Sequence, residues 1–188
     1  TRSWSSRPSQ ANSMLQLTKG DALALLEQHK QELLRHPDDC VMCALTEGRD
    51  AALVLKHDPH GVVVLDRFGN RHAHLLVISR RHVENATELS WLEYSALQRL
   101  AYEAAQALSK AVQPRRVFIA AFGSSDPQPM TFSHFHVHVV PIQKDDDRPR
   151  PAQVFSWTEG VVTYEPEEAA ELVAQLKSAW PETRKSVA

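Results

Sequence analysis

Three histidines stand at alternate positions in the segment His134, Phe135, His136, Val137, His138. In a β-strand, alternate side chains share a face, so the three imidazoles would project together while the residues between them face a core. Imidazole titrates near neutral pH, and it can hold a metal, bind phosphate or act as a nucleophile. The alternative is an edge strand with a solvated polar face, which the strict spacing disfavours. The segment therefore predicts a strand that carries chemistry.

The only cysteines in the chain are Cys40 and Cys43, in a C-x-x-C pair. A secreted disulfide framework normally needs more cysteines, so the pair favours a cytoplasmic location and a metal or redox use. No thioredoxin-like βαβ pattern surrounds the pair, which disfavours a redox dithiol. Two buried thiols without a ligand remain an alternative to a metal.

The bulk properties limit the class of protein. A length of 188 residues favours one domain with a tail. The formal net charge of −2 and the pI near 6.5 predict neither nucleic acid nor a membrane surface as a partner. No apolar run approaches the roughly 18 residues that span a bilayer. Residues 1–17 begin with a segment rich in Ser and Arg, and we expect them to be a disordered tail before a single domain at 18–188.

The hydrophobic pattern predicts helices and strands in an order typical of an α+β domain on an antiparallel sheet. A helix is expected over about 18–36, a long helix with Ser90 as its N-cap over about 91–111, and a last helix from Glu165 or Pro166 to about Ala179. Five strands are expected, at 52–56, 62–67, 74–79, 117–122 and in the histidine segment. The first two are separated by Asp58-Pro59-His60-Gly61, which favours a hairpin.

The histidine segment and the following Val139 and Val140 resemble the histidine triad motif, His-x-His-x-His-x-x with apolar x. The segment from His74 to Asn85 resembles the strand of that family that ends in GH-L-V-I-P-K-R-H, and Asp66 lies at the matching interval before it. The resemblance covers a core of about residues 38–142. It implies a five-stranded antiparallel sheet with a long central helix, a homodimer, and a nucleotide as the bound partner.

The family resemblance also implies catalytic roles. His136 matches the nucleophile, which attacks the α-phosphate and forms a nucleotidyl-histidine intermediate. His138 would donate to the phosphate oxygens and stabilise the developing charge. Thr131 matches a position where many members have a Ser that assists the leaving group, although it could be a loop hydroxyl without a role. Retention of His138, rather than Gln, favours the hydrolases over the uridylyltransferase branch.

Nucleotide-binding residues are implied in the same way. Asp66 matches the carboxylate that accepts the ribose hydroxyls, and a surface carboxylate is the alternative. Four residues match apolar positions that wall the base, and core packing without ligand contact is the alternative for each: Val41, Met42, Leu45 and Leu65.

The resemblance finally implies a metal. Some triad proteins use a Cys-x-x-Cys pair, a downstream His and the first triad His as ligands, and here Cys40, Cys43, His82 and His134 fill those positions. This Cys₂His₂ set is typical of tetrahedral structural zinc. Under this interpretation His134 is structural and anchors the histidine strand to the N-terminal region.

The sequence departs from the family pattern in the loop before the triad. Pro129-Met130 replace Gly-Gln, residues 123–126 lack the usual Asn, and Ser79 replaces a Pro. We expect a zinc-containing hydrolase that acts on a dinucleoside polyphosphate or a nucleoside phosphoramidate. The altered loop leaves two alternatives open, a nucleotide-binding regulatory module with little catalysis and a zinc-dependent interaction protein.

Overall fold

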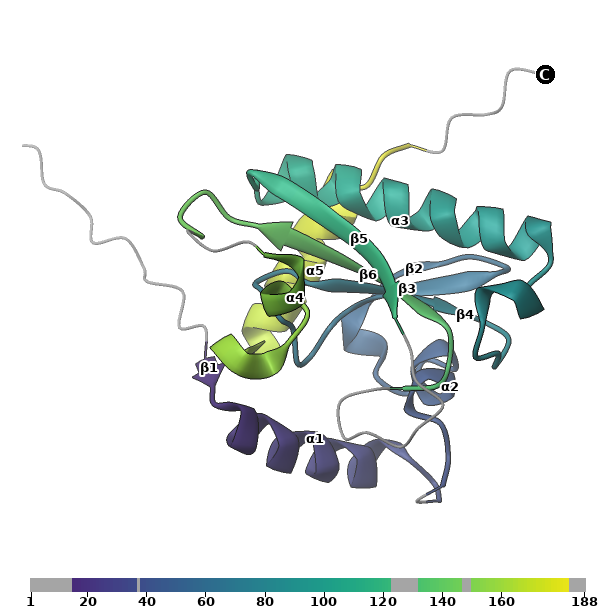
Figure 1. Ribbon diagram of the computed structural model, residues 1–188, viewed down its shortest axis with the longest axis horizontal. Coiled ribbons are helices and arrows are strands. Elements are labelled where there is room, and N and C mark those ends of the chain that lie inside the picture. Colours follow the sequence, from purple (N-terminus) through teal and green to yellow (C-terminus); the bar gives the residue numbers. More distant parts are fainter. Residues whose placement is uncertain (1–14, 37, 123–131, 147–149, 183–188) are drawn as a thin grey trace, which may run out of the picture.

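The computed structural model describes residues 15–36, 38–122, 132–146 and 150–182, and these contain a five-stranded antiparallel sheet (Figure 1). The strand order is β2-β3-β4-β6-β5. The strands are β2 (Val54–His57), β3 (Gly61–Leu65), β4 (Leu75–Ser79), β5 (Arg116–Phe122) and β6 (His136–Ile142). The predicted α+β class and the five-stranded antiparallel sheet are confirmed.

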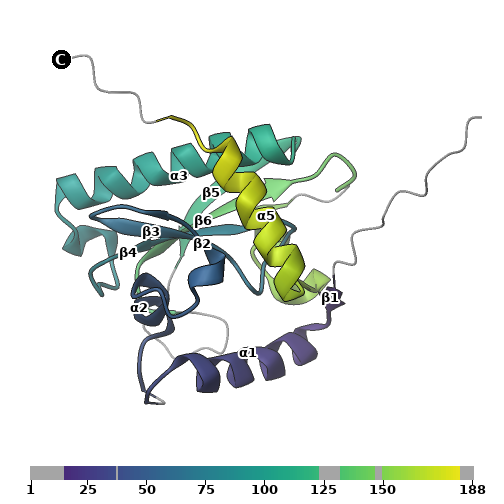
Figure 2. The ribbon, with the colours of Figure 1, turned by 180° about the vertical axis from the view of Figure 1, so that it is seen from behind.

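The two central strands β3 and β4 are buried along their whole length, so both faces of the sheet need a cover. On one face, Val63, Leu65, Val77 and their neighbours pack against α3 (Trp91–Ala111) and α5 (Pro166–Ala179). On the other face, the alternate residues of β3 and β4 pack against α2 (Val41–Thr46) and the end of α1 (Lys19–Leu33). Figure 2 shows α5 running from α3 toward α1 across one side of the molecule.

Local chemistry sets the ends of the helices. Ser90 and Glu93 form a capping box in which each side chain accepts a hydrogen bond from the backbone N–H of the other residue, so α3 begins directly after Ser90 as predicted. The last helix has Pro166 in its first position, where no backbone N–H is needed. The first helix is shorter than predicted, because Leu34 already has an extended backbone.

Several short elements were not predicted. Leu15–Leu17, at the end of the segment assigned to the tail, form β1, which pairs with β7 (Val161–Thr163). Two further helical segments and three 3₁₀ turns complete the described chain: α2, α4 (Pro151–Val154), η1 (Ala51–Leu53), η2 (Ala86–Glu88) and η3 (Trp157–Glu159). Segments of three to six residues are too short to show a periodic pattern. The first fourteen residues of the expected tail lie outside the described part of the chain.

The histidine strand starts later than predicted. Pairing with β4 places Ile78 opposite His136, whereas His134 precedes β6. The intervening Phe135 points into the core with Val137, as the alternation predicts. Among the described residues, no helix combines the length and the apolar character that crossing a membrane requires.

Gly61 allows the closest approach between the sheet and α3. A Cβ atom at Gly61 would lie 2.5 Å from Leu97 Cδ2 and 3.0 Å from the carbonyl oxygen of Ile78. We therefore expect Gly61→Ala to lower the free energy of unfolding by about 1–3 kcal/mol, as overpacking of a core does. Gly20 is the matched control, since its Cβ would meet nothing closer than Thr18 Oγ1 at 3.9 Å. In α1, Gly20→Ala should be neutral or stabilising by up to about 1 kcal/mol. Urea denaturation measures both, and wild-type stability of Gly61→Ala would contradict this packing.

Candidate functional site

A cavity of about 280 Å³ lies over the sheet face that α1 and α2 cover. The residues predicted to bind the nucleotide all line it: Val41, Met42, Leu45, Leu65 and Asp66. His136 and His138 line the same cavity, so the expected base wall, ribose carboxylate and catalytic imidazoles share one space. Because most of the wall is aliphatic or aromatic, the cavity suits a flat apolar group that is attached to a polar one.

His136 is held in one tautomer by the backbone. Its Nδ1 lies 2.7 Å from the carbonyl oxygen of His134, and a carbonyl can only accept, so Nδ1 carries the proton. The lone pair is then on Nε2. Burial lowers the pKa of His136, although the hydrogen bond to His134 opposes that shift. A buried, neutral imidazole with an unprotonated Nε2 is the form that a nucleophile requires.

His138 lies beside His136, with 4.7 Å between the ring centroids. Its Nδ1 is 3.0 Å from Nε2 of His74. Burial first, and then the neighbouring His74 and His136, lower the pKa of His138 well below its ordinary value. The imidazoles of His136 and His138 are therefore neutral near pH 7, and no charge repulsion separates them.

His74, for which no role was predicted, lies within the site. It is 1% exposed and lines the cavity. Its Nδ1 lies 3.0 Å from Asp66 Oδ2 and 3.2 Å from the backbone nitrogen of Asn70. A protonated Nδ1 satisfies the carboxylate and an unprotonated one satisfies the Asn70 N–H, so each tautomer has one partner on that side. His74 thus links the carboxylate of Asp66 to His138.

The alternation along β4 could have revealed this position. Leu76 and Ile78 lie opposite His138 and His136 in the register between β4 and β6. Counting back two residues from Leu76 places His74 on the same face of the sheet as the rings of His136 and His138.

The four predicted metal ligands lie together at a second place. One ligand atom each from Cys40, Cys43, His82 and His134 falls within 4.8 Å of the others. Cys43 Sγ is 3.3 Å from Nδ1 of His82 and 3.4 Å from Nδ1 of His134, and Cys40 Sγ is 3.5 Å from that same Nδ1. Tetrahedral zinc with ordinary bond lengths would set sulfur and nitrogen ligands roughly 3.5 Å apart.

The protonation states of these four side chains also suit the binding of a metal cation. Nε2 of His134 lies 2.7 Å from the carbonyl oxygen of Ser79, so it carries the proton and Nδ1 presents its lone pair to the sulfurs. Burial lowers the pKa of His134 to about 4. Burial and the adjacent Cys40 raise the pKa of Cys43 to about 12, so two thiolates need a positive charge between them. The donor set and its geometry therefore suit zinc.

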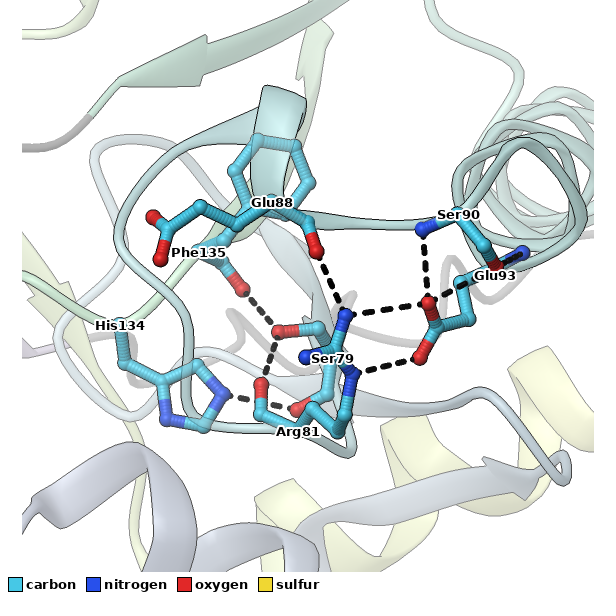
Figure 3. A network of polar contacts seen from close by, with 7 residues as sticks. All are labelled: Ser79, Arg81, Glu88, Ser90, Glu93, His134 and Phe135. Atoms are coloured by element: carbon cyan, nitrogen blue, oxygen red, sulfur yellow. Dashed lines mark hydrogen bonds and ion pairs between the residues drawn. The ribbon is translucent and has the colours of Figure 1, made fainter.

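Ser79, at the position where the family pattern has a proline, connects β4 to His134, one of the predicted metal ligands (Figure 3). Its N–H donates to the carbonyl of Phe135 at 3.2 Å, a bond that a proline could not make. Its hydroxyl lies 2.8 Å from the carbonyl oxygen of Arg81 and 3.0 Å from that of Phe135. Together with the bond from His134 to its carbonyl, Ser79 fixes the residues that surround the triad.

Arg81 extends this network to the start of α3 (Figure 3). Its Nε lies 2.7 Å from Glu93 Oε1, and its Nη2 donates to the carbonyl of Glu88 at 2.6 Å. Hydrogen bonds from Arg81 and Ser90 lower the pKa of Glu93 to about 2. The segment between β4 and α3, which includes His82, is therefore held at both ends.

Other walls of the cavity come from outside the expected core 38–142. Leu26 and His29 on α1 and Phe155 and Trp157 near η3 all line it. Trp157 packs with Phe68 and Leu26 in a small apolar cluster that joins α1 to the C-terminal segment. Thr131, the predicted aid to the leaving group, lies outside the described residues, as do positions 123–130 of the altered loop.

Comparisons with known proteins agree with this geometry. The family model described as "Scavenger mRNA decapping enzyme C-term binding" matches residues 39–149. An uncharacterized HIT-like protein of Saccharolobus solfataricus is 32% identical over 108 residues, which cover 57% of this chain and 76% of that relative. A HIT-like protein of Bartonella henselae shares the fold, with a TM-score of 0.60 at 16% identity over 77% of this chain and 98% of its own.

A zinc-bound histidine triad family protein of Mycobacterium smegmatis is also similar, with a TM-score of 0.52 at 25% identity. The match covers 75% of this chain and 97% of that protein. The chain has the triad, the paired cysteines, the five-stranded sheet and the match to the family model over residues 39–149. It therefore belongs to the histidine triad family.

Proposed function

We propose that this protein hydrolyses a nucleotide conjugate at the α-phosphate through a nucleotidyl-histidine intermediate on His136. The observation that carries the proposal is the hydrogen bond from His136 Nδ1 to the carbonyl of His134, which leaves Nε2 unprotonated in a residue that lines the cavity. Membership of the histidine triad family, whose proteins bind nucleotides, supports the same conclusion.

The cavity suggests how the substrate binds. The apolar residues from α2 and β3 would pack on the base, and Asp66 would accept the ribose hydroxyls. A nucleotide held in this way brings its α-phosphate toward His136 and His138. We propose a dinucleoside polyphosphate or a nucleoside phosphoramidate as the substrate, since each carries a leaving group on that phosphorus.

The reaction has two displacements. In the first, Nε2 of His136 attacks the α-phosphorus, the bond from phosphorus to the leaving group breaks, and the leaving group takes a proton from solvent, with Thr131 proposed as its aid. In the second, water attacks the phosphorus and gives a proton to solvent, the P–N bond to His136 breaks and the nucleoside monophosphate leaves. His138 would stabilise the charge on the phosphate oxygens in both steps.

We also propose that zinc at Cys40, Cys43, His82 and His134 is structural and that the protein is a homodimer. Such a site would join α2, the end of β4 and the start of β6 through four ligands. Structural zinc stabilises the folded state directly, because the unfolded chain does not hold the ligands together. Size-exclusion chromatography with light scattering tests the dimer.

Substitution of the nucleophile tests the mechanism. His136→Ala should reduce kcat by several orders of magnitude while Kd for the nucleotide stays nearly unchanged, because the lost interaction forms only in the transition state. A panel of adenylyl and guanylyl conjugates, with products identified by mass, measures turnover. After an alkaline quench, the wild-type peptide that spans residue 136 should carry one added nucleotidyl group. Hydrolysis by His136→Ala at the wild-type rate would exclude the covalent mechanism, and tight binding without turnover by the wild type would favour a regulatory module.

The ribose contact can be tested with matched ligands. Asp66→Ala should weaken binding of a nucleoside monophosphate by about 1.5–3 kcal/mol, the range for a hydrogen bond to a charged group. The loss should be much smaller for the 2′,3′-dideoxy analogue, which lacks both donors. Isothermal titration calorimetry measures the two values. An equal loss for both ligands would show that Asp66 acts only through His74 or the backbone N–H of Phe68, to which it is also bonded.

Metal analysis tests the zinc proposal. Freshly purified, untagged protein should contain about one zinc per chain, and Cys43→Ser should lose the metal and thermal stability together, as expected for a site that stabilises the fold. Elemental analysis and thermal denaturation give the two readings. Wild-type protein that is free of metal and fully stable would disprove a structural zinc.

A further inference from the structure

The loop that carries Asp66 and His74 is fastened to a C-terminal strap, defined here as residues 157–164. Gly69 and Val162 exchange both backbone hydrogen bonds, at 2.9 and 2.8 Å. Arg71 Nη2 lies 2.7 Å from Glu159 Oε2. The strap lies outside the segment that the family model matches, 39–149, so the site depends on a part of the chain beyond that core.

The contact closest to His74 involves an unusual backbone conformation. Ala73 is fully buried and has a φ of 63°, in the left-handed region. A residue with a Cβ adopts that conformation at a cost of roughly 1–2 kcal/mol, so the surrounding structure must hold it. The backbone N–H of Ala73 donates to the hydroxyl oxygen of Tyr164 at 2.8 Å. A buried N–H without this acceptor would be costly.

Tyr164 is itself fixed and keeps its proton. Tyr164 is 8% exposed and belongs to the main core cluster. The centroid of its ring lies 5.8 Å from that of the His72 ring. Burial raises the pKa of Tyr164, so the hydroxyl stays protonated, and it lies 3.5 Å from Nδ1 of His72. The hydroxyl thus accepts from Ala73 on one side and faces a ring nitrogen on the other.

The residue after Ala73 is His74, whose two ring nitrogens lie 3.0 Å from Asp66 and 3.0 Å from His138. The space around it is tight, because a Cβ on Gly69 would lie 3.1 Å from the Cβ of His74. A rotation of the peptide between Ala73 and His74 would therefore change both ring contacts. The conformation of Ala73 sets the position of the imidazole that orients His138.

We propose that Tyr164 is a positioning residue, which holds Ala73 in its left-handed conformation and thereby sets His74 between Asp66 and His138. The proposal rests on the proposed function for its effect on turnover. It assigns the C-terminal strap a part in catalysis, through Tyr164, in addition to its packing.

Tyr164→Phe is the direct test, since it keeps the ring and removes only the hydroxyl group that accepts from Ala73. We expect kcat to fall by about tenfold to a hundredfold, the size of effect that a small misplacement of catalytic groups produces, with KM changed less than about twofold. Tyr94→Phe is the matched control, because Tyr94 packs against the same core from α3, and its kcat should equal that of the wild type. Zinc content should stay at the wild-type level in both variants.

A double variant separates positioning from general stability. If Tyr164 acts through His74, then Tyr164→Phe should lower kcat no further in a His74→Ala background. A multiplied loss in the double variant would overturn the proposal. So would a Tyr164→Phe protein with a lower Tm and a wild-type kcat, because that result describes a residue that only packs.

A spectroscopic measurement makes the test independent of turnover. In ¹⁵N NMR spectra, Tyr164→Phe should shift the ring nitrogens of His74 and His138, whereas Tyr94→Phe should leave them in place. Unchanged resonances in Tyr164→Phe would overturn the proposal. If the wild type hydrolyses no conjugate, the proposed function fails, and these spectra still decide whether Tyr164 positions His74.

Discussion

Three of the polar groups of His134 contact three different parts of the site. Nε2 donates to the carbonyl of Ser79, Nδ1 faces the sulfurs of the two cysteines, and the backbone carbonyl accepts from Nδ1 of His136. The contacts of the ring hold the His134 backbone in place, and this sets the direction in which its carbonyl points. Anchoring the His134 ring therefore fixes the tautomer of His136, so the predicted metal ligands would influence the proposed nucleophile without touching a substrate.

Burial is the second constraint on the site. His138 lies in contact with both His74 and His136, an arrangement that charged rings would oppose by repulsion. Burial lowers the pKa of His136 and of His138, so these two rings are neutral near pH 7 and can pack together. The same desolvation keeps Nε2 of His136 unprotonated near pH 7, as the proposed attack on phosphorus requires. The apolar walls that would pack on a base thus also keep the imidazoles of His136 and His138 neutral.

The parts of the site that could be predicted from the sequence are those with a short, regular spacing and those that match the family motif. The alternation predicted that Phe135 and Val137 face the core. The resemblance predicted that Cys40 and Cys43 lie beside His82 and His134, which are distant in the sequence. The contact between Tyr164 and Ala73 joins residues that are 91 positions apart and follows from no local pattern. The pairing of β1 with β7 was not predicted either, because each strand has only three residues and shows no periodic pattern.

The cavity divides between two kinds of segment. The imidazoles, the carboxylate and the base wall on α2 lie within residues 39–149, the part that the family model matches. Leu26 and His29 on α1, with Phe155 and Trp157 near η3, lie outside it and close the cavity. Burial lowers the pKa of His29, so this wall offers a neutral imidazole beside apolar rings. A substitution on α1 changes the space that a substrate meets and leaves the bonds around His136 in place, because none of those bonds involves α1. In the proposed reaction, selectivity between conjugates would therefore depend on these outer segments, whereas the proposed reacting groups lie within residues 39–149.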